Sequence, residues 1–356
     1  MQPDERQFYA RHFSLAEVGE TGQQRLKQSC VLVIGAGGLG CPALQYLTAA
    51  GVGQLTICDG DRIELSNLHR QPLYRPDDTG KWKAKCAVAR CLEQNPWITV
   101  KAVTTWITAE NIEALAHAHD LVLDCTDNLA TNVLIHDACY LTRTPLITAA
   151  IHTFEGIIHR YEFNRKHQAC ARCLHSDIAQ PAPVDSCAER GVIGALPGIF
   201  GAMQAEIALH HLLEIKTLSN ATSWIMDLKT MQSRQIGWSQ RQDCPLCAAS
   251  KPPSLNALHP NEPDVNITSL DTVGANARLI DIREIEERIT APFPSQFASE
   301  HRPFSAWQNT FLPMHRPCIL LCATGKRSAY LAKKLHQEGH TQVYSLKGGI
   351  DALPVN

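Results

Sequence analysis

SCVLVIGAGGLG, residues 29–40, is the stretch that decides the fold of the N-terminal region. The continuous apolar run over residues 29–34 predicts a buried parallel strand. Three glycines follow in a G-x-G-x-x-G pattern, a segment of helical composition covers residues 41–50, and a second short strand is predicted over residues 55–58. Strand, glycine-rich turn, helix and strand in this order predict a doubly wound α/β domain with a Rossmann-like nucleotide site.

The same alternation continues, and we place this first domain at residues 1–248. Further elements predicted within it are a buried strand over 120–124, a helix over 129–141, extended segments over 145–163 and a long helix over 199–215.

Residues 249–264 are rich in proline and lack hydrophobic periodicity, which predicts an interdomain linker. A second, smaller α/β domain is predicted over residues 265–356. Its expected elements are strands over 278–282 and 319–322 and a helix over 328–338.

Composition excludes several classes of protein. The 356 residues carry a formal net charge of -2, so bulk charge does not favour binding to nucleic acid or to a membrane surface. The polar N-terminus has no signal-peptide core, and no apolar run is long enough to cross a membrane. Fourteen cysteines in such a chain do not suggest a disulfide framework. We therefore expect a reducing, cytoplasmic location.

The glycine-rich turn is the first half of a nucleotide site. Gly35, Gly37 and Gly40 allow a close approach to phosphate groups, and the following helix N-terminus favours negative charge. Asp59 ends the next predicted strand, where an acid can bind a ribose hydroxyl. These residues alone fit NAD as readily as ATP.

The residues after the ribose acid favour ATP. Asn67, Arg70, Gln71 and Lys83 bring amides and two cations to a position that suits a triphosphate, whereas hydride transfer does not require them. Asp127 follows the next strand at the switch-point crevice, where it can bind Mg²⁺. The alternative is that Arg70 and Lys83 are solvated surface charges and that Asp127 caps the next helix.

Two C-x-x-C pairs predict a structural zinc site. Four thiolates on two tight turns form a closed tetrahedral site, and the long separation means that the metal joins distant segments. A redox pair and an iron–sulfur cluster are the alternatives. The four ligands are Cys170, Cys173, Cys244 and Cys247.

Two further cysteines are candidate nucleophiles. Cys187 lies in a segment with two prolines and a neighbouring arginine, so it is either an exposed reactive thiol or an inert loop cysteine. Cys322 follows a predicted strand, and a short loop with Lys326 and Arg327 leads from it into a helix. Loop N–H groups, the helix N-terminus and these cations are expected to stabilise a thiolate or a persulfide.

Taken together, these motifs resemble two known families. Residues 1–250 resemble the MoeB/ThiF branch of the ubiquitin-activating superfamily, through the glycine-rich turn, Asp59-Gly60-Asp61, Ser66-Asn67-Leu68-His69-Arg70-Gln71, Asp124-Cys125-Thr126-Asp127-Asn128 and both C-x-x-C pairs. Residues 265–356 resemble a rhodanese domain, through Arg278-Leu279-Ile280-Asp281-Ile282-Arg283, the loop from Cys322 to Ser328 and Gly348-Gly349. One departure is Ala323, which stands where typical rhodaneses have arginine.

The resemblance assigns roles to individual residues. It implies that ATP is bound by Gly38, Asp59, Asn67, Arg70 and Lys83, and that Asp127 holds Mg²⁺ near the α-phosphate. Arg11 matches an arginine that reaches into the ATP site of the neighbouring subunit, which implies a homodimer. Cys187 matches a loop cysteine that, in some members, bonds covalently to the substrate, a ubiquitin-like sulfur-carrier protein. Cys322 would carry a persulfide.

The activity implied is ATP-dependent adenylation of the C-terminal glycine of a ubiquitin-like sulfur carrier ending in Gly-Gly, followed by transfer of persulfide sulfur to form a thiocarboxylate. A cysteine desulfurase or thiosulfate would supply the sulfur. The rival functions are an NAD-dependent oxidoreductase with structural zinc, a non-catalytic sulfur-relay scaffold, and ATP-dependent activation of a different acceptor such as a tRNA base or a peptide.

Overall fold

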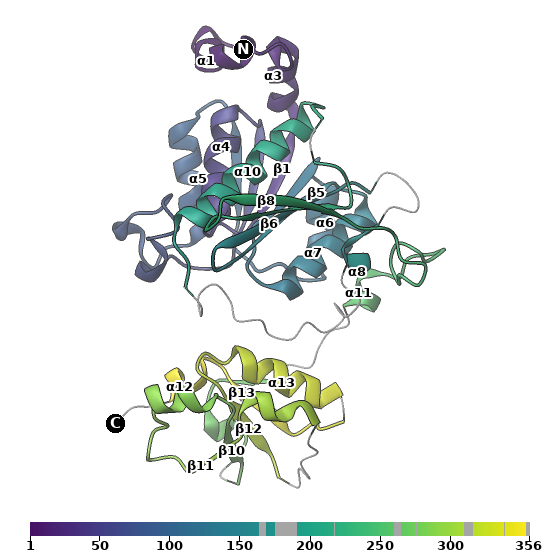
Figure 1. The fold of residues 1–356 in the computed structure, drawn as a ribbon. Coiled ribbons are helices and arrows are strands. Elements are labelled where there is room, and N and C mark those ends of the chain that lie inside the picture. Colours follow the sequence, from purple (N-terminus) through teal and green to yellow (C-terminus); the bar gives the residue numbers. More distant parts are fainter. Residues whose placement is uncertain are drawn as a thin grey trace. The chain divides into compact units, whose positions relative to one another are not determined.

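The computed structural model describes residues 1–163, 169–174, 191–216, 218–259, 265–274, 276–309, 316–337 and 339–353. The residues up to His259 form one compact unit and those from Val265 onward form another (Figure 1). The predicted linker therefore needs correction at its start. Ser254 caps a short helix, α11 (Leu255–Leu258), and Leu255 is buried in the core of the first unit.

An eight-stranded mixed sheet organises the first unit. The strand order is β3-β2-β1-β4-β5-β6-β7-β8. The first five strands pair in parallel and the last three are antiparallel. The strands are β1 (Cys30–Ile34), β2 (Gln54–Cys58), β3 (Thr99–Val103), β4 (Leu121–Asp124), β5 (Leu146–His152), β6 (Glu155–Tyr161), β7 (Thr222–Asp227) and β8 (Gln232–Gly237).

Helices cover both faces of the parallel part, which confirms the doubly wound fold (Figure 1). Alternate residues of β1 point to opposite faces: Val31 and Val33 join one apolar core, and Leu32 and Ile34 join the other. The helices are α1 (Pro3–Phe8), α2 (Ala10–Phe13), α3 (Gly19–Gln28), α4 (Gly40–Ala50), α5 (Lys83–Gln94), α6 (Ile112–His117), α7 (Leu129–Thr142), α8 (Ala171–Leu174) and α10 (Ala195–Leu212).

The second unit is a smaller α/β structure with a parallel sheet of order β11-β10-β12-β13-β9. Its elements are β9 (Asn266–Ile267), β10 (Arg278–Asp281), α12 (Ile285–Thr290), β11 (Ser299–His301), β12 (Cys318–Leu321), α13 (Lys326–Gln337) and β13 (Val343–Leu346). The strand–loop–helix sequence predicted around Cys322 is confirmed as β12, a short loop and α13.

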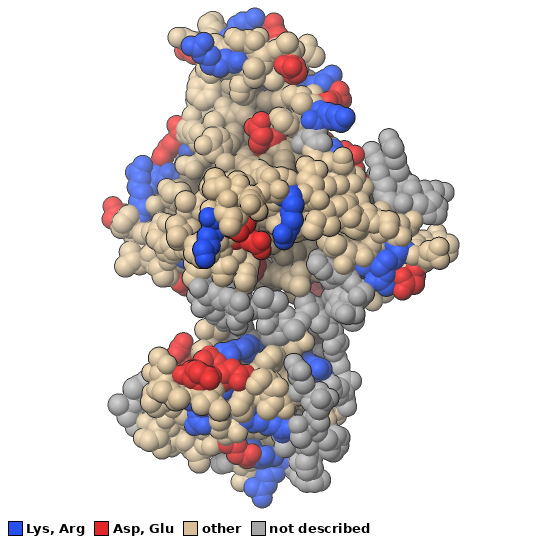
Figure 2. All heavy atoms as spheres, viewed as in Figure 1, with Lys and Arg blue, Asp and Glu red and all other residues tan. Residues whose placement is uncertain are grey.

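Charged residues do not segregate on the surface that Figure 2 shows. On this face of the first unit, acidic and basic side chains are interspersed. Within the described ranges, no helix combines the length and the apolar composition that a bilayer crossing requires.

Candidate active site and metal centre

The glycine-rich turn between β1 and α4 is packed so tightly that side chains do not fit at two of its positions. Gly35 has φ of +90°, and a Cβ there would lie 2.7 Å from the carbonyl oxygen of Cys125. A Cβ at Gly40 would lie 2.0 Å from the carbonyl oxygen of Gly35. The turn therefore presents bare backbone at the start of α4, which is the geometry that a phosphate group requires.

Asp59, the acid predicted to bind the ribose, is held against this turn. Asp59 follows β2; its Oδ2 accepts a hydrogen bond from the Ala36 N–H at 2.7 Å, and its Oδ1 accepts one from the Asp61 N–H at 2.7 Å. Burial raises the pKa of the Asp59 carboxyl above its ordinary value. Each carboxylate oxygen keeps a lone pair that can accept a hydrogen bond from a ribose hydroxyl.

Lys83 begins α5, and its ammonium group is almost fully buried. Its Nζ lies 2.9 Å from Oδ2 of Asp61, whose side chain is 51% exposed. Asp61 was not among the predicted site residues, although it is the second acid of Asp59-Gly60-Asp61. This ion pair argues against the alternative in which Lys83 is a solvated surface charge, since a buried ammonium requires compensation.

Asn67 and Arg70 lie on a turn that begins with a short 3₁₀ helix. Asn67 is buried. Arg70 is half-buried, and its Nη1 donates to the carbonyl oxygen of Ser66 at 3.0 Å. No carboxylate in the described ranges pairs with Arg70. Its charge is thus available to an anionic ligand.

Gln71 packs between this turn and the glycine-rich loop. It is 4% exposed, and its Oε1 is buried without a hydrogen-bond partner in the described part of the chain. A Cβ at Gly37 would lie 3.6 Å from Nε2 of Gln71, so the amide borders the loop that would hold phosphates. A bare glycine cradle with an unpartnered polar atom beside it fits a bound nucleotide.

The two aspartates at the C-terminal end of β4, Asp124 within the strand and Asp127 after it, have different environments. Asp124 is fully buried and accepts hydrogen bonds from the Thr126 amide and hydroxyl and from Asn132 and Thr148. Asp127 is exposed, and α7 is capped instead by Asn128, whose Oδ1 accepts from the Thr131 N–H at 2.8 Å. The alternative role for Asp127 as the helix cap is therefore wrong. Its carboxylate remains available for a ligand such as Mg²⁺.

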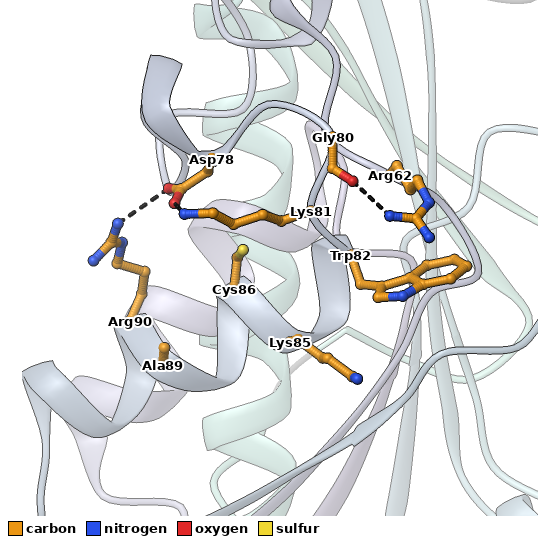
Figure 3. A pocket seen from close by; sticks show the side chains of 9 residues that line it. All are labelled: Arg62, Asp78, Gly80, Lys81, Trp82, Lys85, Cys86, Ala89 and Arg90. Atoms are coloured by element: carbon orange, nitrogen blue, oxygen red, sulfur yellow. Dashed lines mark hydrogen bonds and ion pairs between the residues drawn. The ribbon is translucent and has the colours of Figure 1, made fainter.

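A separate hollow of about 600 Å³ lies along the outer side of α5 (Figure 3). Its lining includes Trp82 and Lys85 but not Lys83. The guanidinium of Arg62 stacks over the Trp82 ring at 4.1 Å, and Asp78 pairs with two other cations of the lining. The predicted nucleotide residues do not line this hollow.

The four predicted zinc ligands converge. All are buried, and their sulfur atoms lie within 4.8 Å of one another. Individual separations are 3.6 Å between Cys170 and Cys244 and 3.2 Å between Cys173 and Cys247. Tetrahedral zinc with bonds of about 2.3 Å requires sulfur atoms about 3.8 Å apart, so the cluster fits the ion with small adjustments. Hydrogen bonding within the cluster, chiefly from Cys170, lowers the pKa of Cys247 below its ordinary value.

A buried carboxylate that the sequence analysis missed supports this cluster. Asp137, on α7, accepts two hydrogen bonds from Nε of Arg172, which lies inside the first C-x-x-C pair. His136 lies 3.0 Å and His259 lies 2.7 Å from its oxygens. Burial alone would raise the pKa of Asp137, but these hydrogen bonds outweigh it and hold the pKa below its usual range. The signal in the sequence that could have identified Asp137 was an acidic residue within the otherwise apolar run of α7.

The thiol of Cys322 lies in the second unit at the end of β12. Cys322 is 1% exposed, and its Sγ accepts a hydrogen bond from the Gly325 N–H at 3.1 Å. Ser328 Oγ lies 3.5 Å away. A Cβ at Gly349 would lie 2.2 Å from the carbonyl oxygen of Cys322, so the closing glycine turn packs directly on the loop.

One of the two predicted cations of this loop is paired with an acid. Arg327 pairs with Glu287 of α12 and lowers the pKa of that carboxyl, so its charge is compensated by an acid. The side chain of Lys326 lies outside the described residues, as does the whole of Cys187. The observed stabilisation of the thiol comes from the backbone of the loop.

Arg11 is exposed on α2, away from the glycine-rich turn of its own chain. Tyr9, two residues earlier, packs against Gly51 at the C-terminal end of α4 and accepts a hydrogen bond from Asn95 at 2.7 Å. The turn lies at the other end of α4, which is 11 residues or about 16 Å long.

Comparison with known proteins decides the family. The ThiF family model matches residues 9–246. The chain belongs to the ThiF family. A rhodanese-like domain model matches residues 269–353, so this ThiF protein also carries a rhodanese-like domain. Both resemblances drawn from the motifs are confirmed.

Curated relatives in this family share the sequence over most of the first unit. The sulfur carrier protein adenylyltransferase of Thermus thermophilus is 40% identical over 67% of this chain and 89% of its own. The SAMP-activating enzyme E1 of Haloferax volcanii is 38% identical over 67% of this chain and 87% of its own. The adenylyltransferase and sulfurtransferase MOCS3 of Drosophila virilis is 36% identical over 79% of this chain and 61% of its own.

Solved structures show the ThiF fold of the first unit. The crystal structure of E. coli MccB with ATP has a TM-score of 0.57 and 20% identity, covering 68% of this chain and 75% of that chain. PaaA gives a TM-score of 0.57 at 24% identity, covering 68% of this chain and 76% of that chain. At these identities the likeness concerns the fold alone.

Proposed function

We propose that this chain adenylates the C-terminal glycine of a ubiquitin-like sulfur carrier and then transfers sulfur to it. The observation that carries the proposal is the pairing of two chemistries in one chain. A glycine cradle with a ribose acid and two cations suits ATP, and a thiol held by a loop N–H suits a persulfide. An NAD oxidoreductase would require neither the cations nor the thiol loop.

In the first step, the carrier's terminal carboxylate attacks the α-phosphorus of ATP. A phosphorus–oxygen bond forms, the bond to the β-phosphate oxygen breaks, and pyrophosphate leaves. Lys83 and Arg70 stabilise the charge that builds up on the phosphate oxygens. Asp127 would hold Mg²⁺, which supplies further charge neutralisation there.

In the second step, a persulfide on Cys322 attacks the acyl carbon and expels AMP. The carrier is then joined to Cys322 through an acyl-disulfide. A second thiol, which we assign to Cys187, attacks the Sγ of Cys322 in this acyl-disulfide, and the sulfur bonded to the acyl carbon is the leaving group. The carrier leaves as a thiocarboxylate, and the new Cys187–Cys322 disulfide requires an external thiol reductant before the next turnover.

The sulfur donor and the compartment belong to the same proposal. A cysteine desulfurase or thiosulfate supplies the sulfane sulfur. None of the thirteen cysteines in the described ranges is in a disulfide, which supports a reducing cytoplasmic location. The buried thiolate cluster also supports a resident structural zinc ion.

We further assign a homodimer, in which Arg11 serves the partner's ATP. The length of α4, about 16 Å, lies between Tyr9 and the glycine-rich turn of the same chain, which favours a role for Arg11 at the turn of another copy. In a homodimer, this exposed arginine would enter the ATP site of the second copy.

Carrier-dependent exchange between ATP and labelled pyrophosphate tests the adenylation step. We expect exchange with a carrier ending in Gly-Gly, and a large loss in Asp127→Ala and Lys83→Met. Lys85→Met is the matched control, because Lys85 lies on the same helix but lines the hollow of Figure 3. Absence of exchange with every Gly-Gly carrier would overturn the proposal.

A further inference from the structure

Trp106 is an exposed indole at the edge of the sheet where the nucleotide residues gather. It follows β3 and is 63% exposed. A Cβ at Gly60 would lie 2.9 Å from the indole Cδ2 and 3.0 Å from Cε2. The ring therefore covers the residue directly after Asp59, the ribose acid, and most of its surface remains open.

The backbone beneath this indole is fixed at several points. The Asp59 N–H donates to the carbonyl oxygen of Val103 at 3.0 Å, and Cys58 Sγ donates to the carbonyl oxygen of Thr105 at 3.4 Å. Asn111 Nδ2 donates to the carbonyl oxygen of Trp106 at 2.8 Å. The exposed indole thus stands on an anchored loop.

The groups along this edge follow the order of the groups in a nucleotide. The glycine cradle suits phosphates, and Asp59, bonded to the Ala36 N–H of the cradle, suits the ribose. In the sheet, β2 lies between β1 and β3. The glycine cradle follows β1, Asp59 follows β2 and Trp106 follows β3, so Trp106 lies beyond Asp59 on the side away from the cradle. Ligands of doubly wound sheets lie across the carboxyl ends of neighbouring strands.

From this arrangement we propose that Trp106 is the platform on which the adenine ring of ATP stacks. The proposal rests on the proposed function and names the group that binds the base. Any base offers a π-face to an indole, and such stacking contributes about 5- to 150-fold in affinity, the equivalent of about 1–3 kcal/mol. Stacking also covers apolar surface that the free protein leaves in water.

Steady-state kinetics of the exchange reaction form the first test. Trp106→Ala raises the KM for ATP by about 5- to 150-fold and leaves kcat and the KM for the carrier near their wild-type values. Trp106→Phe retains most of the affinity, because a phenyl ring still stacks. An unchanged KM for ATP in Trp106→Ala would overturn the proposal. A rise in the KM for the carrier alone would assign the indole to carrier docking and would overturn it as well.

Fluorescence provides a second test that needs no carrier and no turnover. A non-hydrolysable ATP analogue quenches tryptophan emission of the wild type, and inorganic pyrophosphate, which lacks a base, does not. Trp106→Phe abolishes the quenching, whereas Trp82→Phe retains it, because Trp82 is already stacked by Arg62 in the other hollow (Figure 3). Equal quenching in Trp106→Phe and wild type would refute the stacking. If no Gly-Gly carrier supports exchange but the quenching behaves as described, the proposed adenylation of a carrier fails while the stacking of adenine on Trp106 stands.

Discussion

Replacement of Gln71 by methionine should stabilise the free protein while impairing its chemistry. The Oε1 of this buried side chain has no partner in the described residues. A buried acceptor without a hydrogen bond costs about 1–3 kcal/mol, whereas exchange for an apolar side chain of similar length costs less than about 1.5 kcal/mol. We expect a net gain of about 1–2 kcal/mol. For a unit of this size the unfolding midpoint should rise by roughly 2–8 °C.

Gln204 provides the matched control for this substitution. It is equally buried, but its Nε2 donates to the carbonyl oxygen of Asp124 at 2.8 Å and its Oε1 accepts from Cys125 Sγ. Gln204→Met breaks these bonds and should lower the midpoint, so the two variants should shift in opposite directions.

Thermal unfolding of ligand-free protein and pyrophosphate exchange are the two assays. Gln71→Met should unfold at a higher temperature than wild type. Its exchange rate should fall about tenfold or more, because the missing amide oxygen can no longer accept a hydrogen bond from the bound substrates. If Gln71→Met is destabilised as much as Gln204→Met, the amide is already satisfied in the free protein. Full exchange activity in Gln71→Met would show that the substrates do not use it.

Three further predictions concern the metal centre, its support and the ribose acid. Cys247→Ser should lower the bound zinc measured by atomic absorption and lower the unfolding midpoint, and full zinc occupancy in this variant would contradict the ligand set. Asp137→Ala should cost about 3–5 kcal/mol in a denaturant titration, because Arg172 would remain buried without its partner, and a loss below about 1 kcal/mol would contradict this role. Because burial raises the pKa of Asp59 and the ionised carboxylate binds the ribose, ATP affinity should fall on acidification at a higher pH than for an exposed aspartate; Asp59→Asn should flatten this pH dependence.

Features built from neighbouring residues could be predicted from sequence, and features built from distant residues could not. The strand, turn and helix over residues 29–50 are decided by local composition, and the structure reproduces them nearly residue for residue. Helix α10 begins four residues before the predicted start. Pro197 lies in its first turn, where a missing N–H removes no hydrogen bond, so proline there does not mark a boundary.

The same distinction holds at the sites. The convergence of the two C-x-x-C pairs could be predicted, because a tetrahedral metal requires four ligands. The contacts of Asp137 with Arg172 and His259 could not, because only the fold brings these residues together. The short helix α11 depends on burial of Leu255 against the first unit, which no local periodicity encodes. The pairing of Arg327 with Glu287 is likewise a contact between separate helices. Such contacts determine which of the predicted cations remain available.

The most direct test of the central claim is the mass of the carrier after reaction. Purified carrier would be incubated with the protein, ATP and a persulfide donor under reducing conditions, and its intact mass measured. With the wild-type protein, one carboxylate oxygen of the carrier should be replaced by sulfur. Cys322→Ala should retain pyrophosphate exchange but leave the carrier mass unchanged. Thiocarboxylate formed by Cys322→Ala at the wild-type rate would show that sulfur does not pass through Cys322.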